Sequence, residues 1–376
     1  MLRRRAARSP RVYLIGVAGH PNFGDEAITV GWLRWLARHR PRHEVWLDVP
    51  NASGTAALHH REHPRLVIVD TMHRLGWEAP DVSAVEAVVE HARAVLREPF
   101  RAPRWLAGLE ALLGADVVHV LGGGYLNARH APAASVGATL AWMAEHTESR
   151  TAITGAGLTP SDERLDALWR EAADHLDVAT VRDPESARVL PGAELAPDDI
   201  WLGGAAQHVA TGQRHPEVMV LAQGDGHERL DELTDMVEAQ LRHWGVRGGD
   251  YGVVEANPPV DGFIRAELER RLGPHIFYSF REAHRHGLPA QPGQRWLSTR
   301  YHPHLLAAAS GAQGVAVSVA DGYYDVKHQA VLAAGSQWPL VRLGDDPVEA
   351  GSAGSLPARR DEHERALHAI ASRIYA

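Results

Sequence analysis

The chain has 376 residues and a formal net charge of −8, which argues against nucleic acid as its main partner. Hydrophobic residues make up 45% of the sequence, enough for packed cores, and the length favours two α/β domains. No apolar run approaches the roughly 20 residues of a membrane span. Cysteine does not occur, which excludes disulfides, thiolate catalysis and cysteine-based zinc sites.

The N-terminus is basic and precedes a short apolar stretch at residues 12–18. This stretch is short for the apolar part of a secretory signal, and it runs directly into a polar loop. Both features favour a first strand. We therefore expect a flexible basic tail over residues 1–10 and a cytoplasmic protein.

Strand and helix signals alternate through the first half of the chain. Residues 71–113 show no clear strand, which predicts inserted helices. The alternation is typical of a doubly wound parallel sheet with helices on both faces. Apolar runs predict strands at 11–19, 43–50, 65–70, 116–124, 150–158 and 178–183, and three- and four-residue spacing predicts helices near 25–39, 132–146 and 161–175.

A glycine pair, Gly203 and Gly204, ends this first pattern, and polar residues continue to position 216. We expect two Rossmann-like domains facing one cleft: an N-terminal domain over residues 11–203, a linker over 204–216 and a C-terminal domain over 217–376. The second half predicts strands at 217–223, 251–257, 275–280, 314–320 and 340–343, and helices near 227–244, 262–272, 303–310, 327–334 and 360–374.

The loop after the first expected strand is a candidate binding loop. It carries Asn22, Gly24 and Asp25, and its amides should lie at the carboxyl edge of the sheet. It lacks the Gly-Lys-Ser/Thr of a P-loop. Asp25 and the adjacent Glu26 either accept hydrogen bonds from sugar hydroxyls or favour the first turn of a helix.

Two further loops follow expected strands in the first half. Gly122, Gly123 and Gly124 indicate either a ligand lying against backbone or a sharp turn. Arg182, which ends another strand, either holds an anion or forms a surface pair with Asp183.

The richest stretch for chemistry lies near the C-terminus. Arg300 and His302 stand at an expected helix start, where Pro303 suits the first turn. Arginine can bind a carboxylate or phosphate in bidentate fashion, and histidine exchanges protons near neutral pH. His302 and His304 are alternatively a metal pair, although no acidic ligand stands nearby in the sequence.

Lys327 is the only lysine among the 39 lysine and arginine residues. Either it survives by chance in an arginine-rich composition, or the position requires a compact ammonium that a planar guanidinium cannot replace.

Together these segments resemble the polysaccharide pyruvyltransferases. The resemblance covers about residues 11–345 and implies a GT-B-like fold in a transferase that uses phosphoenolpyruvate to build pyruvate ketals on sugars, with release of phosphate. It rests on residues 22–26, 122–124, 181–186, 300–302 and 324–327, which follow one another in the family's order.

The resemblance implies specific roles. Arg300, His302 and Lys327 match the family's Arg-x-His motif and later lysine, which implies that they bind and help to protonate phosphoenolpyruvate in the C-terminal domain. Arg182 and Asp261 match further binding positions. The chain departs from the family pattern at His20-Pro21 and at Pro303-His304.

The expected reaction needs no metal or cofactor besides phosphoenolpyruvate as co-substrate, and Asp25 would position the acceptor hydroxyl. The N-terminal domain is the expected acceptor side. The expected acceptor is a sugar or glycan, either free or linked to a nucleotide or a lipid. Its identity, the choice between ketal and enolpyruvyl ether, and the oligomeric state are open. Two other functions are a GT-B glycosyltransferase using a nucleotide sugar and a non-catalytic sugar- or anion-binding protein.

Overall fold

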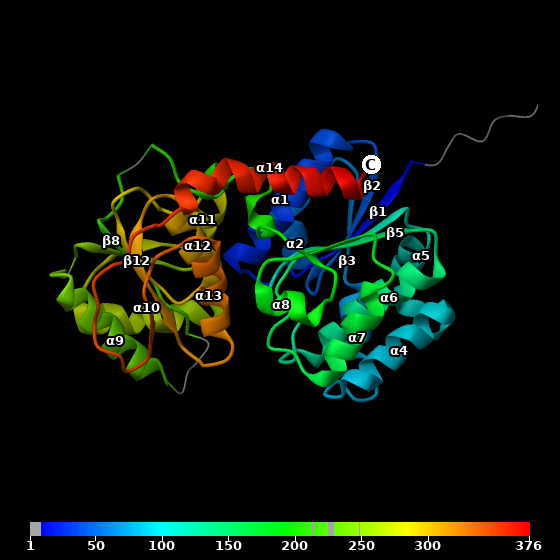
Figure 1. Ribbon diagram of the computed structural model, residues 1–376, viewed down its shortest axis with the longest axis horizontal. Helices are drawn as coiled ribbons and strands as arrows, with labels where there is room; N and C mark the ends of the chain where they lie inside the picture. The colour runs from blue at the N-terminus through cyan, green and yellow to red at the C-terminus, as the bar shows by residue number, and fades with distance from the viewer. Residues whose placement is uncertain (1–8, 213, 225–228, 248) are drawn as a thin grey trace, which may run out of the picture. The chain divides into compact units, whose positions relative to one another are not determined.

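A computed structural model describes residues 9–212, 214–224, 229–247 and 249–376 (Figure 1). Residues 1–8 of the expected basic tail therefore lie outside the described residues. The chain forms two compact units. Unit 1 contains the described residues up to His20 with Ile28–Asp199 and Ala369–Ala376, and unit 2 contains Pro21–Ala27 and Ile200–His368.

Unit 1 is built on a seven-stranded sheet whose strands are all parallel. The strand order is β3-β2-β1-β4-β5-β6-β7, so the direction of winding reverses between β1 and β4. Ligands of doubly wound sheets bind outside the carboxyl ends of the strands at such a switch point. The strands are β1 Arg11–Ile15, β2 Glu44–Asp48, β3 Leu66–Val69, β4 Val117–Val120, β5 Arg150–Ala156, β6 Val178–Val181 and β7 Glu194–Leu195.

Helices cover this sheet, and α4, α6 and α7 pack side by side (Figure 1). Helix α4 buries Val85, Val88, Ala92 and Val95 at three- and four-residue spacing, which places one apolar stripe against the core. The inserted helices predicted over residues 71–113 are confirmed as α3, α4 and α5. The helices are α1 Phe23–His39, α2 Ala52–His59, α3 Thr71–Trp77, α4 Val85–Arg97, α5 Leu106–Leu113, α6 Ala134–His146, α7 Glu163–Ala173 and α8 Pro184–Val189.

Unit 2 has a six-stranded parallel sheet in the order β10-β9-β8-β11-β12-β13. Its strand β11 pairs with both β8 and β12 and lies at the centre, yet the sequence pattern did not predict it. Only two apolar residues lie between the polar residues Arg295 and Ser298, and an apolar run of this length does not predict a strand. The strands are β8 Val218–Leu221, β9 Tyr251–Val254, β10 Ile276–Tyr278, β11 Arg295–Ser298, β12 Gln313–Ser318 and β13 Leu340–Arg342.

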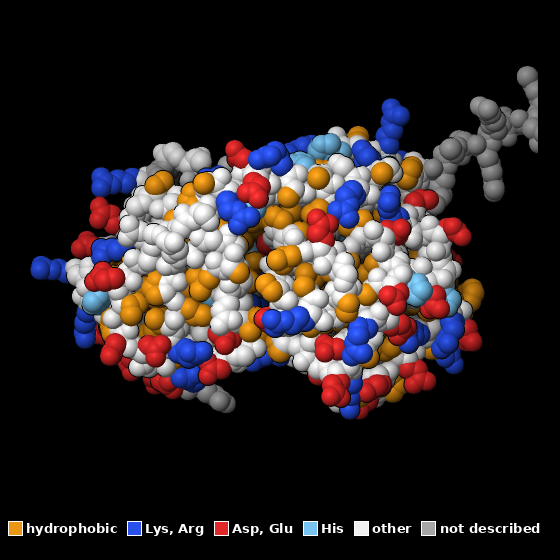
Figure 2. All heavy atoms as spheres, in the orientation of Figure 1, with side chains coloured by type: hydrophobic (Ala, Val, Ile, Leu, Met, Phe, Trp, Pro, Cys, Tyr) orange, Lys and Arg blue, Asp and Glu red, His pale blue; other side chains and the backbone are white. Residues whose placement is uncertain are grey.

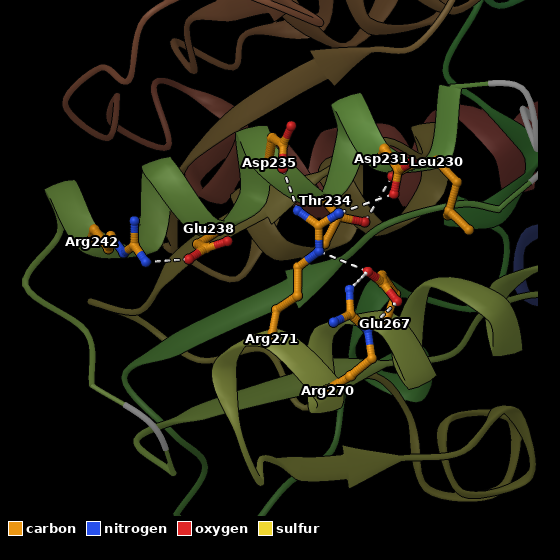
Figure 3. Close-up of polar contacts among 9 residues, drawn as sticks. All are labelled: Leu230, Asp231, Thr234, Asp235, Glu238, Arg242, Glu267, Arg270 and Arg271. Atoms are coloured by element: carbon orange, nitrogen blue, oxygen red, sulfur yellow. Dashed lines mark hydrogen bonds and ion pairs between the residues drawn. The ribbon is translucent and has the colours of Figure 1, made fainter.

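Six helices complete the described part of unit 2, and two of them share a charged surface. Arg271 on α10 pairs with Asp231 (3.0 Å) and Asp235 on α9 and with Glu267 (2.7 Å) on its own helix (Figure 3). The acidic partners on α9 are exposed, so each pair contributes little to stability. The helices are α9 Leu230–His243, α10 Pro258–Leu272, α11 Phe280–His286, α12 Tyr301–Ala309, α13 Tyr324–Ala334 and α14 Leu356–Ile374, whose last residues belong to unit 1.

The compact units depart from the expected domain boundaries at both ends of the chain. Residues 21–27 belong to unit 2, and residues 369–376 belong to unit 1. The expected linker, residues 204–216, also belongs to unit 2. The chain passes between the units inside α1 and α14, where no break in composition marks the change.

Charged side chains of both signs lie on the surface of the protein (Figure 2). On the face of the described residues drawn in Figure 2, basic and acidic side chains are interspersed rather than gathered into a basic stripe. Among the described residues, no helix combines the length and apolar character that crossing a bilayer requires.

A buried carboxyl group anchors unit 1 at the end of β2. The Oδ2 atom of Asp48 accepts hydrogen bonds from the Tyr13 hydroxyl (2.6 Å) and from the Met72 backbone N–H (2.8 Å). Burial raises the pKa of Asp48 to about 7, despite these hydrogen bonds. Because the folded pKa lies above the unfolded one, this group favours folding when protonated and loses that contribution as the pH rises.

We expect Asp48→Asn to remove this pH dependence, because the amide oxygen can accept the same hydrogen bonds without ionising. Between pH 5 and pH 8 the wild-type free energy of unfolding should fall relative to that of the variant by about 2 kcal/mol. Urea unfolding at several pH values measures the difference. A constant difference across this range would contradict the assignment.

Candidate functional site

The segment between β11 and α12 is held rigidly at the carboxyl edge of the unit 2 sheet. Thr299 Oγ1 accepts a hydrogen bond from the Gln223 backbone N–H (2.9 Å), and Ser298 Oγ donates to the Arg300 carbonyl oxygen (3.0 Å). Arg300 is extended (φ −113°, ψ 143°) and precedes the helix, which begins at Tyr301. Pro303 therefore falls in the first turn, where its missing N–H is tolerated.

Asp261 holds the guanidinium of Arg300. Its Oδ1 forms an ion pair with Arg300 Nη2, and its Oδ2 accepts hydrogen bonds from the backbone N–H groups of Ala256 (2.9 Å) and Asn257 (2.8 Å). The side chain of Asp261 is 2% exposed and that of Arg300 is 11% exposed. A charged pair with fixed partners at this depth orients the guanidinium. Asp261, expected to bind substrate, thus lies where it positions Arg300.

The start of α1 packs against His302. The Phe23 backbone N–H donates to the Ala256 carbonyl oxygen (2.9 Å), which brings the Asn22–Asp25 segment to the same end of unit 2. A Cβ atom added to Gly24 would lie 1.7 Å from His302 Nδ1, so only glycine leaves room for the imidazole. The structure therefore brings together the motif at residues 22–26 and the motif at residues 300–302.

Asn22 and Asp25 share this helix start. The Asn22 carbonyl oxygen accepts a hydrogen bond from the Glu26 backbone N–H (3.1 Å), which closes the first turn. Asn22 and Asp25 are half-buried, whereas Glu26 is fully buried. Of the two acidic residues, Asp25 is therefore the one that a ligand at this helix start can reach.

Lys327 stands on α13 beside two tyrosines. Its Nζ lies 3.7 Å from the centroid of the Tyr323 ring and 5.4 Å from that of Tyr324. Cation–π contacts of this kind restrain an ammonium group without neutralising its charge. The residue as a whole is half-buried.

His304 does not join His302 as a metal pair. Its Nδ1 lies 3.1 Å from His328 Nδ1, and its Nε2 lies 2.9 Å from Ser336 Oγ. Within the described ranges, no group of three or more histidine and acidic side chains could hold a metal ion. His304 instead belongs to the packing between α12 and α13.

In unit 1, the glycine loop after β4 packs against the protein itself. The Gly122 backbone N–H donates to Asp199 Oδ2 (2.9 Å), and a Cβ on Gly122 would lie 2.9 Å from the Gly155 carbonyl oxygen. Gly123 has a positive φ of 140°. Gly124 is half-buried, and its carbonyl oxygen accepts a hydrogen bond from Asn127 (2.7 Å). Packing and turn geometry thus account for the first two glycines without a ligand.

Asp199 is a buried residue that sequence reasoning missed. Its Oδ2 also accepts hydrogen bonds from Trp32 Nε1 (2.8 Å) and Thr154 Oγ1 (2.6 Å), and burial raises its pKa to about 6. The two adjacent acids, Asp198 and Asp199, are the sequence signal that marks this position.

Arg182 pairs with Asp198 rather than with Asp183. The Arg182 Nη1 atom lies 2.9 Å from Asp198 Oδ2, and the two side chains are 4% and 2% exposed. Asp183 instead caps α8, where its Oδ1 accepts a hydrogen bond from the Ser186 backbone N–H (2.7 Å). Of the two alternatives for Arg182, the surface pair with Asp183 is wrong, because the Asp183 carboxylate is used as a helix cap.

Two solved structures share the architecture of two parallel sheets. UDP-GlcNAc 2-epimerase from Neisseria meningitidis, bound to UDP-GlcNAc, has a TM-score of 0.52 and 10% identity, with 97% of this chain and 99% of that chain covered. Medicago truncatula UGT71G1, complexed with UDP-glucose, has a TM-score of 0.50 and 9% identity, with 98% of each chain covered. The fold defines a class, the GT-B-like proteins with two Rossmann-like domains, and the expected fold is confirmed.

Within this class, the family model for polysaccharide pyruvyl transferase matches residues 22–243, more than half of the chain. The chain belongs to the polysaccharide pyruvyl transferase family and is a transferase. The match includes the first loop, the glycine loop and Arg182, and it ends before Arg300, His302 and Lys327. A comparison with curated protein sequences gave no match.

We expect Gly24→Ala to destabilise unit 2 by about 1–3 kcal/mol, because the new methyl group overlaps the His302 ring. Gly262→Ala is the matched control, since Gly262 also lies in a helix but has nothing within 4 Å of an added Cβ. The control should be neutral or stabilising by up to about 1 kcal/mol, as alanine is the better helix former. Urea unfolding measures the free energy of unfolding of both variants. An equal change in the two variants would contradict the packing of Gly24 on His302.

Proposed function

We propose that this transferase moves the pyruvyl unit of phosphoenolpyruvate onto hydroxyl groups of a sugar or sugar-like acceptor, forms a ketal and releases phosphate. The supporting observation is the cationic set in unit 2, where Arg300, His302 and Lys327 start two neighbouring helices in a chain of net charge −8. Phosphoenolpyruvate carries a carboxylate and a phosphate in a small volume. Arginine and lysine suit these two groups in different ways, the first by a planar fork and the second as a point charge.

The proposed reaction begins with a proton. His302 gives its proton to the methylene carbon of phosphoenolpyruvate, and the electron pair of the C=C bond forms the new C–H bond. The adjacent carbon becomes oxocarbenium-like. An acceptor hydroxyl oxygen bonds to this carbon and releases its proton to a base, for which Asp25, next to the glycine under His302, is the candidate.

The phosphate then leaves and the ketal closes. The C–O bond to the phosphate breaks, and the electron pair of that bond departs with the phosphate. The oxygen of a second acceptor hydroxyl bonds to the same carbon, and its proton goes to His302, which gave up its own proton in the first step. Arg300 and Lys327 stabilise the charge on the departing phosphate, an effect that is large where the cations are already in position. In this scheme no metal or cofactor takes part, and the supply of phosphoenolpyruvate makes the cytoplasm the proposed location.

A glycosyltransferase that uses a nucleotide sugar is the second candidate, because the fold is shared with UGT71G1. The two functions differ in the donor that binds the protein in the absence of acceptor, which is phosphoenolpyruvate for the first and a nucleotide sugar for the second. They are therefore separated by the next experiment.

We expect phosphoenolpyruvate at 100 times its dissociation constant to stabilise the protein by about 2.7 kcal/mol, and UDP-glucose to have no effect. His302→Asn should keep this stabilisation but lose phosphate release when acceptor sugars are added, because the amide cannot deliver a proton. Thermal melts and a phosphate assay with nucleotide- and lipid-linked sugars measure both. Stabilisation by UDP-glucose alone would favour the glycosyltransferase.

Lys327→Arg tests whether the single lysine has a chemical role. We expect a loss of at least about tenfold in kcat/KM for phosphoenolpyruvate, equal to about 1.4 kcal/mol, because the guanidinium is bulkier and flatter than the ammonium between the tyrosines. The KM for the acceptor should not change. Steady-state kinetics with each substrate varied in turn, beside a thermal melt, measure this. Unchanged kinetics would show that the lysine is an accident of composition.

A further inference from the structure

Two buried histidines connect α12 and α13, the helices whose first turns hold residues proposed to bind phosphoenolpyruvate. His304 and His328 are fully buried, and their Nδ1 atoms lie 3.1 Å apart. His304 is two residues after His302 on α12, and His328 directly follows Lys327 on α13. This hydrogen bond thus joins α12 to α13 two residues from His302 and one residue from Lys327.

The direction of this hydrogen bond follows from its neighbours. Ser336 Oγ accepts from the Trp338 backbone N–H (3.3 Å), so its own proton is available for His304 Nε2 (2.9 Å). A neutral His304 that accepts at Nε2 carries its proton on Nδ1 and donates it to His328 Nδ1. We assign these tautomers because the protons on Ser336 Oγ and His304 Nδ1 then both have acceptors, and the proton of His328 lies on its Nε2 atom.

The surroundings keep both rings neutral and fixed. Burial lowers the pKa of His328 to about 4 and that of His304 well below its usual range. Of the charged neighbours of His328, Lys327 lowers its pKa and Asp325 raises it. The His304 ring also stacks on Trp338, with centroids 4.4 Å apart and an interplanar angle of 16°.

Trp338 is itself locked in the core. Its Nε1 donates to the Ala312 carbonyl oxygen (3.1 Å), and a Cβ on Gly314 would lie 2.8 Å from the indole. His304 therefore has little freedom to move, and His328 takes its position from it. The Thr299 backbone, next to Arg300, also lies close enough to His328 to influence its pKa.

We propose that the His304–His328 hydrogen bond is the positioning link of the phosphoenolpyruvate site and sets the separation between the Arg300–His302 segment and Lys327. The inference rests on the proposed function and adds two positioning residues to it. Neither ring needs to touch the substrate. A change in the link alters the spacing of the cations, on which the binding of a small ligand with two charged groups depends.

The test compares two substitutions at the same position. His328→Leu introduces an apolar side chain of similar length and removes the hydrogen bond. His328→Asn places an amide atom where Nδ1 stood and restores an acceptor for His304. His215→Leu is the control, because His215 is also a buried histidine of unit 2 and makes one hydrogen bond, to the Tyr278 hydroxyl (3.0 Å), away from α12 and α13.

We expect the dissociation constant for phosphoenolpyruvate to rise at least about tenfold in His328→Leu and to stay within about threefold of wild type in His328→Asn. His215→Leu should lower the melting temperature without weakening binding. Calorimetric titration with phosphoenolpyruvate, after circular dichroism has established that each variant is folded, measures these constants. If His328→Leu does not fold, Ser336→Ala replaces it, with an expected weakening of about fivefold from the loss of one hydrogen bond.

Three results would overturn the inference. Wild-type affinity in folded His328→Leu, or in Ser336→Ala where that variant replaces it, would show that the link does not set the site. Equal weakening in His328→Leu and His215→Leu would show a general effect of stability. Failure of the wild-type protein to bind phosphoenolpyruvate would instead overturn the proposed function, and this inference with it.

Discussion

The contact between Gly24 and the His302 imidazole is the constraint on which the rest of the site depends. It requires a residue without a side chain in the first turn of α1 and a buried histidine in the first turn of α12. The hydrogen bond from Phe23 to Ala256 holds the same helix start beside the residues that fix Asp261. Through Asp261 the constraint extends to Arg300. Segments from opposite ends of the sequence thus determine the geometry of one cationic site.

The side chains of Arg300 and Lys327 are held by different kinds of contact. Arg300 has a buried carboxylate partner, so its direction is fixed while part of its charge is balanced. Lys327 is restrained by aromatic rings, which attract an ammonium but carry no net charge. Arg300 is therefore held by a carboxylate and Lys327 by aromatic rings. The proposed function assigns a ligand with a planar carboxylate and a compact phosphate to these two side chains.

The sequence predicted the sheets well where strands are buried on both faces. Strand β8 is a continuous apolar run, and β1 is one after its first residue, as parallel strands covered by helices should be. The central strand β11 was missed because its apolar run is only two residues long. In unit 1, the pairing of Arg182 with Asp198 depends on how separate loops approach each other, which no local pattern contains.

The sequence names the residues of the candidate site but does not contain their arrangement. Motif order pointed to Arg300, His302 and Lys327, and the family is confirmed by a match that lies elsewhere in the chain. The burial of His304 and His328 had no sequence signal, because a buried neutral histidine and an exposed one look alike in a chain with 24 of them. Only the packing of α12, α13 and the segment around Trp338 distinguishes them.

The passage of the chain between the two units within α1 and α14 has a consequence for modularity. A conventional cut near residue 203 would give an N-terminal fragment that lacks residues 369–376 and a C-terminal fragment that lacks residues 21–27. The second fragment would lose the glycine that packs on His302. Recombination between relatives by a single crossover would likewise separate each unit from one of its own segments. Exchange of an intact unit 2 therefore requires residues 21–27 and residues 200–368 to be transferred together.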